Sequence, residues 1–283
     1  MLQPFFIIYD NKSFLKGKIM CKKESHQKTN IITTGILLII LFTCSSCNVQ
    51  ISVDEDNVTV NGVKLSYKRT IHLEQVYDTQ SATIKLGSGD MDLTGQKENK
   101  ISLDIVIFEK EPNDADVSFV ESEIATESKG NYPVYISSIK GYMPESISLK
   151  LSTGSGDITL HCFHNSSEIS VTAGSGDITI NGCTNIQNID DQTGSGDILF
   201  KDLTKIMNVT SNSGSGDVSV KGSVISSAYI ETGSGDIEIS KTHIKKIITQ
   251  TGSGDIILSN STYDEISFDT GSGDVIQQDT ETK

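Results

Sequence analysis

Residues 154–193 read GSGDITLHCFHNSSEISVTAGSGDITINGCTNIQNIDDQT, which is one 20-residue row written twice with variations. The opening phrase Gly-Ser-Gly-Asp occurs eight times in the 283 residues, with its first glycine at Gly87, Gly154, Gly174, Gly194, Gly214, Gly233, Gly252 and Gly271. The first copy stands far from the second, and from Gly154 onward the phrase recurs at a nearly constant interval. A constant period of about 20 residues is typical of a solenoid, in which each repeat contacts only its neighbours.

Each row contains two runs in which apolar and polar residues alternate, and this period of two predicts half-buried strands. The first run follows the aspartate, and its apolar pairs are Ile158/Leu160, Ile178/Ile180, Ile198/Phe200, Val218/Val220, Ile237/Ile239 and Ile256/Leu258. The second run closes the row, as at Ile169/Val171 and Ile247/Thr249, and turn-forming residues such as Asn181-Gly182 separate the two runs. No row resembles a helix, because β-branched residues, Gly, Ser and Asn dominate.

These patterns predict an all-β fold, a single-stranded parallel β-solenoid with about 19–20 residues per coil. Equivalent strands would stack about 4.8 Å apart, so the rows from Gly154 to Thr270 would give a rod roughly 30 Å long. An antiparallel meander or a sandwich of hairpins is the alternative.

The glycines of the phrase share the parity of the apolar residue that follows them, so we expect them on the inward side or at the bend of each coil. There a side chain would collide with the neighbouring coil, or the φ angle must be positive. These structural-turn residues are Gly154, Gly156, Gly174, Gly176, Gly194, Gly196, Gly214, Gly216, Gly233, Gly235, Gly252, Gly254, Gly271 and Gly273.

The aspartates of the phrase would form an outward ladder. Its members are Asp157, Asp177, Asp197, Asp217, Asp236, Asp255 and Asp274, joined by Asp90 if the distant first copy enters the stack. Two unit charges about 4.8 Å apart repel by about 1 kcal/mol in water, so the ladder needs a compensating interaction. We expect each carboxylate to accept backbone N–H bonds from its own turn. A row of Ca²⁺ sites is the alternative, although one aspartate per turn supplies few of the about six to eight oxygens that calcium prefers.

Residues 1–46 have the pattern of a secretory signal peptide. The apolar run Ile31–Thr43 is short for a membrane span, lysines precede it, and CSSC follows. This ending resembles a bacterial lipoprotein signal, with Cys47 as the expected lipidated residue and Cys44 as the second choice. Met20 is an alternative start, which would make residues 1–19 a start-site artefact. We therefore expect a lipid-anchored protein of the cell envelope, on the outer membrane and facing the periplasm or the cell surface; an uncleaved anchor would also place the remainder outside the cytoplasm.

The remaining chain divides into two predicted parts. Residues 47–150 would hold the lipid anchor, a linker and irregular β-rich coils that cap the solenoid, and residues 151–283 would hold the regular repeats. Asn61-Gly62 predicts a hairpin, and the acidic segment Glu109–Asn131 predicts an insertion in the early coils. Further strand-like runs are Ile101–Phe108, Val117–Val120 and Pro133–Ser138.

The charge of the chain argues against nucleic acid as a partner, because nucleic-acid binding needs a basic surface. The net charge is −14, and the residues from Gly154 onward carry 18 Asp and Glu against 7 Lys. Removal of the signal would leave Cys162 and Cys183 beside the lipid site, one row apart. They would form either a disulfide or two small buried thiols.

The sequence offers no catalytic constellation that we recognise. His161 and His164 flank Cys162, but no second ligand pair lies nearby, so a surface turn is favoured over a metal site. The chain contains no HExxH, Walker or G-x-S-x-G motif. We therefore expect no catalytic residues, no cofactor and no metal.

Four segments carry a family resemblance. They are LSTGSGDITL (151–160), VTAGSGDITI (171–180), DQTGSGDILF (191–200) and, more weakly, KLGSGDMDL (85–93). The rows from about 154 to 276 resemble the bacterial putative adhesin family, which is related to the head GIN domain of putative autotransporter adhesins. The resemblance implies a β-solenoid on a secreted or lipid-anchored protein, and it implies no catalytic residues.

We therefore expect a monomeric, non-catalytic binding module that presents an extended surface to an envelope protein or a glycan. Its face would include the outward residues Thr159, Thr179, Ser219 and Glu238, beside the Ser and Asp ladders of the phrase, and repeated weak contacts would add up through avidity. One alternative is a structural or envelope-stress accessory protein that binds another envelope protein through its cap. Another is a polysaccharide-active β-helix enzyme.

Overall fold

The computed structural model describes residues 50–54 and 57–282, and every regular element in these ranges is a strand. The predictions of a signal peptide, an early start-site artefact and a lipid on Cys47 concern residues outside the described ranges. Among the described residues, no helix is long and apolar enough to cross a membrane. The chain forms two compact units. Of the described residues, unit 1 comprises 50–54, 57–69, Ile107–Ser118 and Ala125–Tyr135, and unit 2 comprises Thr70–Val106, Phe119–Ile124 and 136–282.

Most of the strands belong to two 11-stranded sheets. In the order of the first sheet, its strands are β24 (Val275–Gln278), β22 (Ile256–Ser259), β20 (Ile237–Ser240), β18 (Val218–Lys221), β16 (Ile198–Lys201), β14 (Ile178–Asn181), β12 (Ile158–His161), β6 (Asp90–Gln96), β10 (Tyr135–Pro144), β7 (Lys100–Glu109) and β4 (Tyr67–Val76). In the order of the second sheet, they are β25 (Glu281–Thr282), β23 (Thr262–Thr270), β21 (His243–Thr251), β19 (Val224–Thr232), β17 (Ile206–Ser213), β15 (Asn188–Thr193), β13 (Glu168–Ala173), β11 (Ser148–Thr153), β5 (Ser81–Lys85), β9 (Glu123–Ser128) and β8 (Ala115–Val120).

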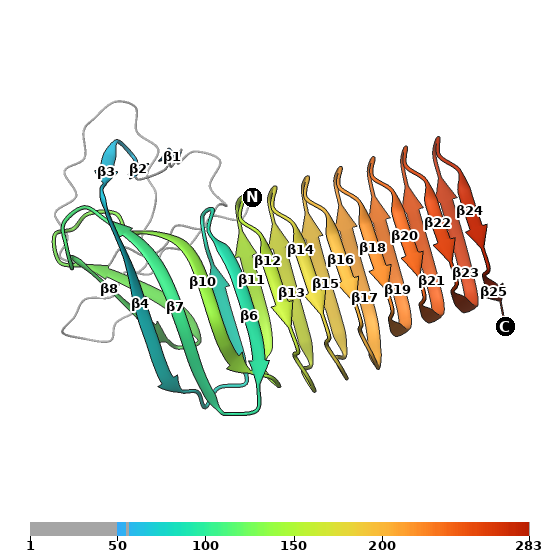
Figure 1. Ribbon diagram of the computed structural model, residues 1–283, viewed down its shortest axis with the longest axis horizontal. Coiled ribbons are helices and arrows are strands. Elements are labelled where there is room, and N and C mark those ends of the chain that lie inside the picture. The colour runs from blue at the N-terminus through green and yellow to red at the C-terminus, as the bar shows by residue number, and fades with distance from the viewer. Residues whose placement is uncertain (1–49, 55–56, 283) are drawn as a thin grey trace, which may run out of the picture. The chain divides into compact units, whose positions relative to one another are not determined.

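Unit 2 contains the predicted parallel β-solenoid. Each coil gives one strand to each sheet, and neighbouring strands pair in parallel from β12 to β24 and from β11 to β25. Figure 1 shows these strand pairs repeating at a regular interval. Equivalent residues lie above one another: Ile158 pairs with Ile178, and Ile178 with Ile198. All three are at most 1% exposed, so the repeated apolar columns form a continuous core. The antiparallel alternative is wrong.

The first copy of the phrase joins the stack in spite of its distance in sequence. The Gly154 N–H donates to the Gly87 carbonyl (2.9 Å), and Ile158 pairs with Met91. On its other side, β6 pairs with β10, with Met91 opposite Ile139. The chain thus places β10 on one side of β6 before it returns to place β12 on the other side. This arrangement explains the long interval between the first two copies.

The later coils are one residue shorter than the earlier ones, and the missing residue lies at a corner. Asn165, Asn185 and Lys205 occupy the same place in three successive coils and have φ angles of 60°, 58° and 56°. The next coil has no counterpart, because Val224 N–H donates directly to the Leu203 carbonyl (2.7 Å) and Ile225 pairs with Ile206. Losing the left-handed residue therefore turns a corner into a longer strand and leaves the buried columns in register.

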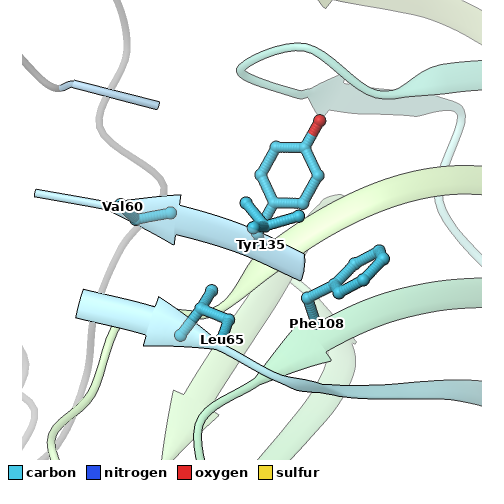
Figure 2. Packing of buried hydrophobic residues seen from close by; sticks show 5 residues of the cluster. Val60, Leu65, Phe108 and Tyr135 are labelled. Carbon is cyan, nitrogen blue, oxygen red and sulfur yellow. The ribbon is translucent and has the colours of Figure 1, made fainter. Parts of the chain in front are cut away.

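Unit 1 has its own small apolar cluster. The strands β1 (Ile51–Asp54), β2 (Asn57–Val60) and β3 (Val63–Leu65) form an antiparallel sheet. The predicted hairpin forms at Asn61-Gly62, whose φ angles of 50° and 78° suit a type I′ turn. Figure 2 shows Val60 and Leu65 with Phe108 and Tyr135; with Val58, these side chains form the cluster.

Candidate binding surface

The Gly-Ser-Gly-Asp corner is a site of close approach between coils. A Cβ atom on the second glycine of the phrase would lie 1.8–2.1 Å from the carbonyl oxygen of the second glycine one coil below, from Gly156 to Gly273. On the first glycine the corresponding distance is 2.1–2.4 Å, from Gly154 to Gly271. The positive-φ glycines are others, namely Gly62, Gly141, Gly182 and Gly222. Steric contact, rather than a positive φ angle, therefore requires glycine at these corners.

The aspartates of the phrase form an outward ladder, with hydrogen bonds that differ from the sequence prediction. The backbone N–H of each aspartate donates to Oδ1 of the aspartate one coil below, as from Asp177 to Asp157 (2.9 Å) and from Asp197 to Asp177 (2.8 Å). The same bond links Asp157 to Asp90, Asp217 to Asp197, Asp236 to Asp217, Asp255 to Asp236 and Asp274 to Asp255. The expectation that each carboxylate binds its own turn is wrong, because the N–H that points at it belongs to the next coil. The ladder thus ties neighbouring coils together.

A second ladder, which the sequence reasoning missed, lies directly before the phrase. The Thr193 hydroxyl donates to the Gly176 carbonyl (3.0 Å) and accepts from the Gly196 N–H (3.1 Å). The same pair of bonds occurs at Thr153, Ser213, Thr232 and Thr251. These hydroxyls are buried, so they satisfy backbone groups that the tight corner would otherwise leave unpaired. The signal in the sequence was a hydroxyl residue before nearly every copy of the phrase.

The first sheet presents the outward face that the sequence predicted. Thr159 pairs with Thr179 on β12 and β14, and Ser219 pairs with Glu238 on β18 and β20. All four are partly exposed, and Leu199 lies between Thr179 and Ser219 in the same column. Lys221 Nζ lies 2.9 Å from the Glu238 carboxylate. This column therefore mixes hydroxyl, apolar and charged groups along the stack.

Amide and hydroxyl side chains form further outward contacts along the stack. Asn185 donates to Asn165 (2.7 Å), and Asn208 donates to Asn188 (2.9 Å). The hydroxyls of Thr184 and Thr204 lie 2.8 Å apart. These neutral groups can both donate and accept hydrogen bonds, and each contact links two neighbouring coils.

The segment around Cys162 is a corner of the solenoid. His161 Nε2 lies 3.8 Å from an Asp92 carboxylate oxygen, and the His164 N–H donates to the Glu145 carbonyl. Within residues 50–54 and 57–282, no group of three or more His, Cys, Asp or Glu side chains is placed to hold a metal ion. That finding includes the aspartate ladder, for which calcium stays an untested alternative.

The two cysteines of the repeats are free, with Cys162 exposed and Cys183 buried. Burial raises the pKa of the Cys183 thiol to about 11. The residue stacked beside Cys162 is Gly182, since the Cys162 N–H donates to the Asn181 carbonyl and a Cβ on Gly182 would meet the Cys162 sulfur at 3.6 Å. The two cysteines thus occupy different columns, and no disulfide joins them.

Unit 1 contains a buried ion pair that the sequence reasoning did not identify. Arg69 donates to both carboxylate oxygens of Glu109 (3.0 and 3.2 Å), and Glu109 is 1% exposed. The N–H groups of Asn113 and Ala115 also donate to it, each at 2.8 Å. Burial alone would raise the pKa of Glu109, but Arg69 and these amides hold it below its usual range. The arrangement holds the loop from 109 to 115 in place, so we interpret it as a structural ion pair.

The repeated parallel coils and outward ladders define a β-solenoid protein with a repetitive surface. The family model Toastrack DUF4097 matches residues 124–278, and the chain belongs to this family. No curated protein matches the sequence significantly.

The chain is also similar to solved structures. A putative adhesin from Bacteroides fragilis is 16% identical, with 74% of this chain and 97% of that chain covered and a TM-score of 0.51. A putative adhesin from Parabacteroides merdae is 13% identical, covers 76% and 96%, and has a TM-score of 0.49. A putative lipid binding protein from Parabacteroides distasonis is 17% identical, covers 76% and 97%, and has a TM-score of 0.47.

Proposed function

We propose that this chain is a non-catalytic, adhesin-like binding module of the cell envelope. It is held on the outer membrane by a lipid on Cys47 and faces the periplasm or the cell surface. The fold, the family and the resemblance to putative adhesins support this proposal. The lipoprotein-like ending CSSC before residue 48 supports the anchor.

The observation that carries the proposal is the in-register stacking of outward side chains. The aspartates of the phrase stack in register from Asp157 to Asp274 and repeat one carboxylate group along the stack, at about 4.8 Å per coil. A ligand with its own repeat, such as a glycan chain, or an extended segment of another envelope protein can therefore meet the same group many times. Contacts that are individually weak then add up through effective concentration.

A two-coil deletion tests the binding surface. Removal of residues 174–213 takes out two rows, β14 to β17, and brings Gly214 to the place of Gly174. We expect the full chain to bind its targets on a glycan array or on whole cells. The shortened chain should bind them more weakly, and its loss of affinity should exceed the share of binding surface that was removed. Replacement of exposed Lys97 by Ala, between β6 and β7 and outside the deleted rows, is the control, and it should leave binding unchanged. Undiminished binding by the shortened chain would contradict the proposal and would favour an accessory protein that binds through its N-terminal strands.

A separate experiment tests the anchor and the location. In cells that produce the full chain, the protein should sediment with membranes, and the Cys47→Ser variant should be released. Protease added to intact cells should degrade the protein if it faces the outside, whereas protection until the outer membrane is opened would place it in the periplasm. Sedimentation of the Cys47→Ser variant with membranes would contradict lipid anchoring at this residue.

A further inference from the structure

One side chain inside the solenoid is an exception to the apolar and hydroxyl character of the core. Asp191 on β15 is 1% exposed, and it occupies the inward column that contains Val171 one coil below and Ser211 one coil above. The same column continues through Ile230, Thr249 and Phe268. Among the described coils, this is the only one that places a carboxyl group at this inward position.

The carboxyl group of Asp191 is only half satisfied. The Ser211 hydroxyl donates to its Oδ1 atom (2.8 Å). Its Oδ2 atom is buried and has no hydrogen-bond partner among the described residues. A neutral hydroxyl group is a poor substitute for water around an ionised carboxylate, so a charge at this position is strongly disfavoured.

No cation compensates the carboxyl group among the described strands that pack against it. On its own strand, the neighbour Asp190 is exposed and adds a like charge. The adjacent strands β13 and β17 carry one charged residue, the exposed Glu168 at the start of β13. Across the coil, β14 has none and β16 ends in the exposed Lys201, while Asp177 and Asp197 lie at exposed corners. The inward residues of β14 and β16 are Ile178, Ile180, Ile198 and Phe200.

We propose that Asp191 makes the coil of residues 174–193 a pH-sensitive weak point in the solenoid, closed while the carboxyl is protonated and loosened when it ionises. Burial raises the pKa of Asp191 well above its usual range, and the Ser211 hydrogen bond opposes this only in part. Because the pKa is higher in the folded state than in the unfolded state, the stabilisation is fully present below the unfolded-state pKa of about 3.9. It is lost as pH rises from there through the folded-state pKa. Over that interval the folding equilibrium constant falls about tenfold for each pH unit.

The position of the weak point gives it a consequence beyond one residue. In a linear array, stability is close to a sum of the individual coils and their nearest-neighbour contacts. A charged Asp191 weakens the contacts of β15 with both β13 and β17, so the coils on its two sides become separate cooperative segments. Acid conditions join these segments, and more alkaline conditions uncouple them.

The test compares unfolding of the full chain with that of two variants between pH 4 and pH 9 at constant ionic strength. Asp191→Asn keeps the shape of the side chain and removes its charge, and exposed Asp190→Asn is the matched control. We expect the wild type to lose stability relative to Asp191→Asn as pH rises, by about tenfold per pH unit until Asp191 ionises. The control should keep the pH dependence of the wild type. Parallel pH profiles for the wild type and Asp191→Asn would overturn the proposal.

A local measurement keeps the proposal testable if the amide variant folds poorly. Asp191→Val reproduces the residue one coil below and should likewise flatten the pH profile. Hydrogen exchange, corrected for the intrinsic effect of pH, should show amide protection in β15 and β17 falling with pH in the wild type and staying constant in Asp191→Val. Constant protection of these strands in the wild type would also overturn the proposal.

Discussion

Substitution of one corner glycine tests the stacked geometry at a single atom. In Gly176→Ala, the new Cβ atom would lie 1.8 Å from the Gly156 carbonyl oxygen, and real Cβ contacts essentially never fall below 3.0 Å. The two coils must therefore move apart locally until the new Cβ atom lies at least 3.0 Å from the Gly156 carbonyl oxygen. No flexible side chain can absorb this movement, because the atom in the way belongs to the backbone.

The energetic cost follows from the hydrogen bonds that cross this corner. Three bonds lie beside Gly176: Ser175 N–H to the Gly154 carbonyl (3.1 Å), Asp177 N–H to Asp157 Oδ1 (2.9 Å) and Ile158 N–H to the Asp177 carbonyl (2.9 Å). The separation that the new Cβ atom requires lengthens them beyond the range of a hydrogen bond. At about 1 kcal/mol each, their loss costs about 3 kcal/mol. Lower entropy of the unfolded chain returns about 0.4–1 kcal/mol, so we expect a net loss of roughly 2–3 kcal/mol.

Thermal unfolding measures this loss against a neighbouring control. A loss of roughly 2–3 kcal/mol corresponds to a decrease in Tm of roughly 4–12 °C in a domain of this size. Ser175→Ala changes an exposed side chain in the same corner and should alter stability by no more than about 0.5 kcal/mol. Equal stability of Gly176→Ala and Ser175→Ala would refute the close approach of the coils and the reasoning built on it.

Four further predictions concern other parts of the molecule. Thr193→Val should cost about 2 kcal/mol in chemical denaturation, because it leaves two buried backbone groups unpaired; an unchanged midpoint would argue against the hydroxyl ladder. Arg69→Met should cost about 3–5 kcal/mol by leaving Glu109 buried without its cation. Since the pKa of Glu109 is lowered, the stabilisation by this pair should be present above about pH 4.5 and be lost as pH falls further. A wild-type pH profile of stability identical to that of Arg69→Met would contradict this. A thiol reagent should label exposed Cys162 in the folded protein and Cys183 only after unfolding; rapid labelling of both would contradict the burial of Cys183. Calcium added to metal-free protein should leave Tm unchanged, and a saturable rise would support the alternative reading of the aspartate ladder.

The sequence was sufficient to predict the solenoid because its signals are local and repeated. Each row repeats apolar residues at one parity, as at Ile158 and Ile178, so an error in one row is corrected by the others. The corner at Asn181-Gly182 could also be predicted from its local sequence. Gly182 adopts the positive φ angle that such a turn needs. The strand direction followed from the constant period.

Contacts between residues far apart in sequence were beyond the same reasoning. The hydrogen bonds that compensate the charges of the aspartate ladder come from the next coil, so the pattern within a single row does not predict them. Asp191 interrupts the apolar pattern of its row, and only its register with Val171 shows that it points inward. Arg69 and Glu109 meet from distant parts of the chain without any repeat to link them.

The stacking of like residues along one axis can be measured directly as a series of distances. Spin labels would be placed on the exposed corner serine Ser155 and, one at a time, on Ser234, Ser253 and Ser272, in a background with all five native cysteines replaced by alanine. These positions are four, five and six coils from Ser155, so the backbone separations should be about 19, about 24 and about 29 Å, increasing by about 4.8 Å per coil. Pulsed electron paramagnetic resonance that shows this constant increment would support the account. Distances that alternate or fail to increase from one coil to the next would contradict it.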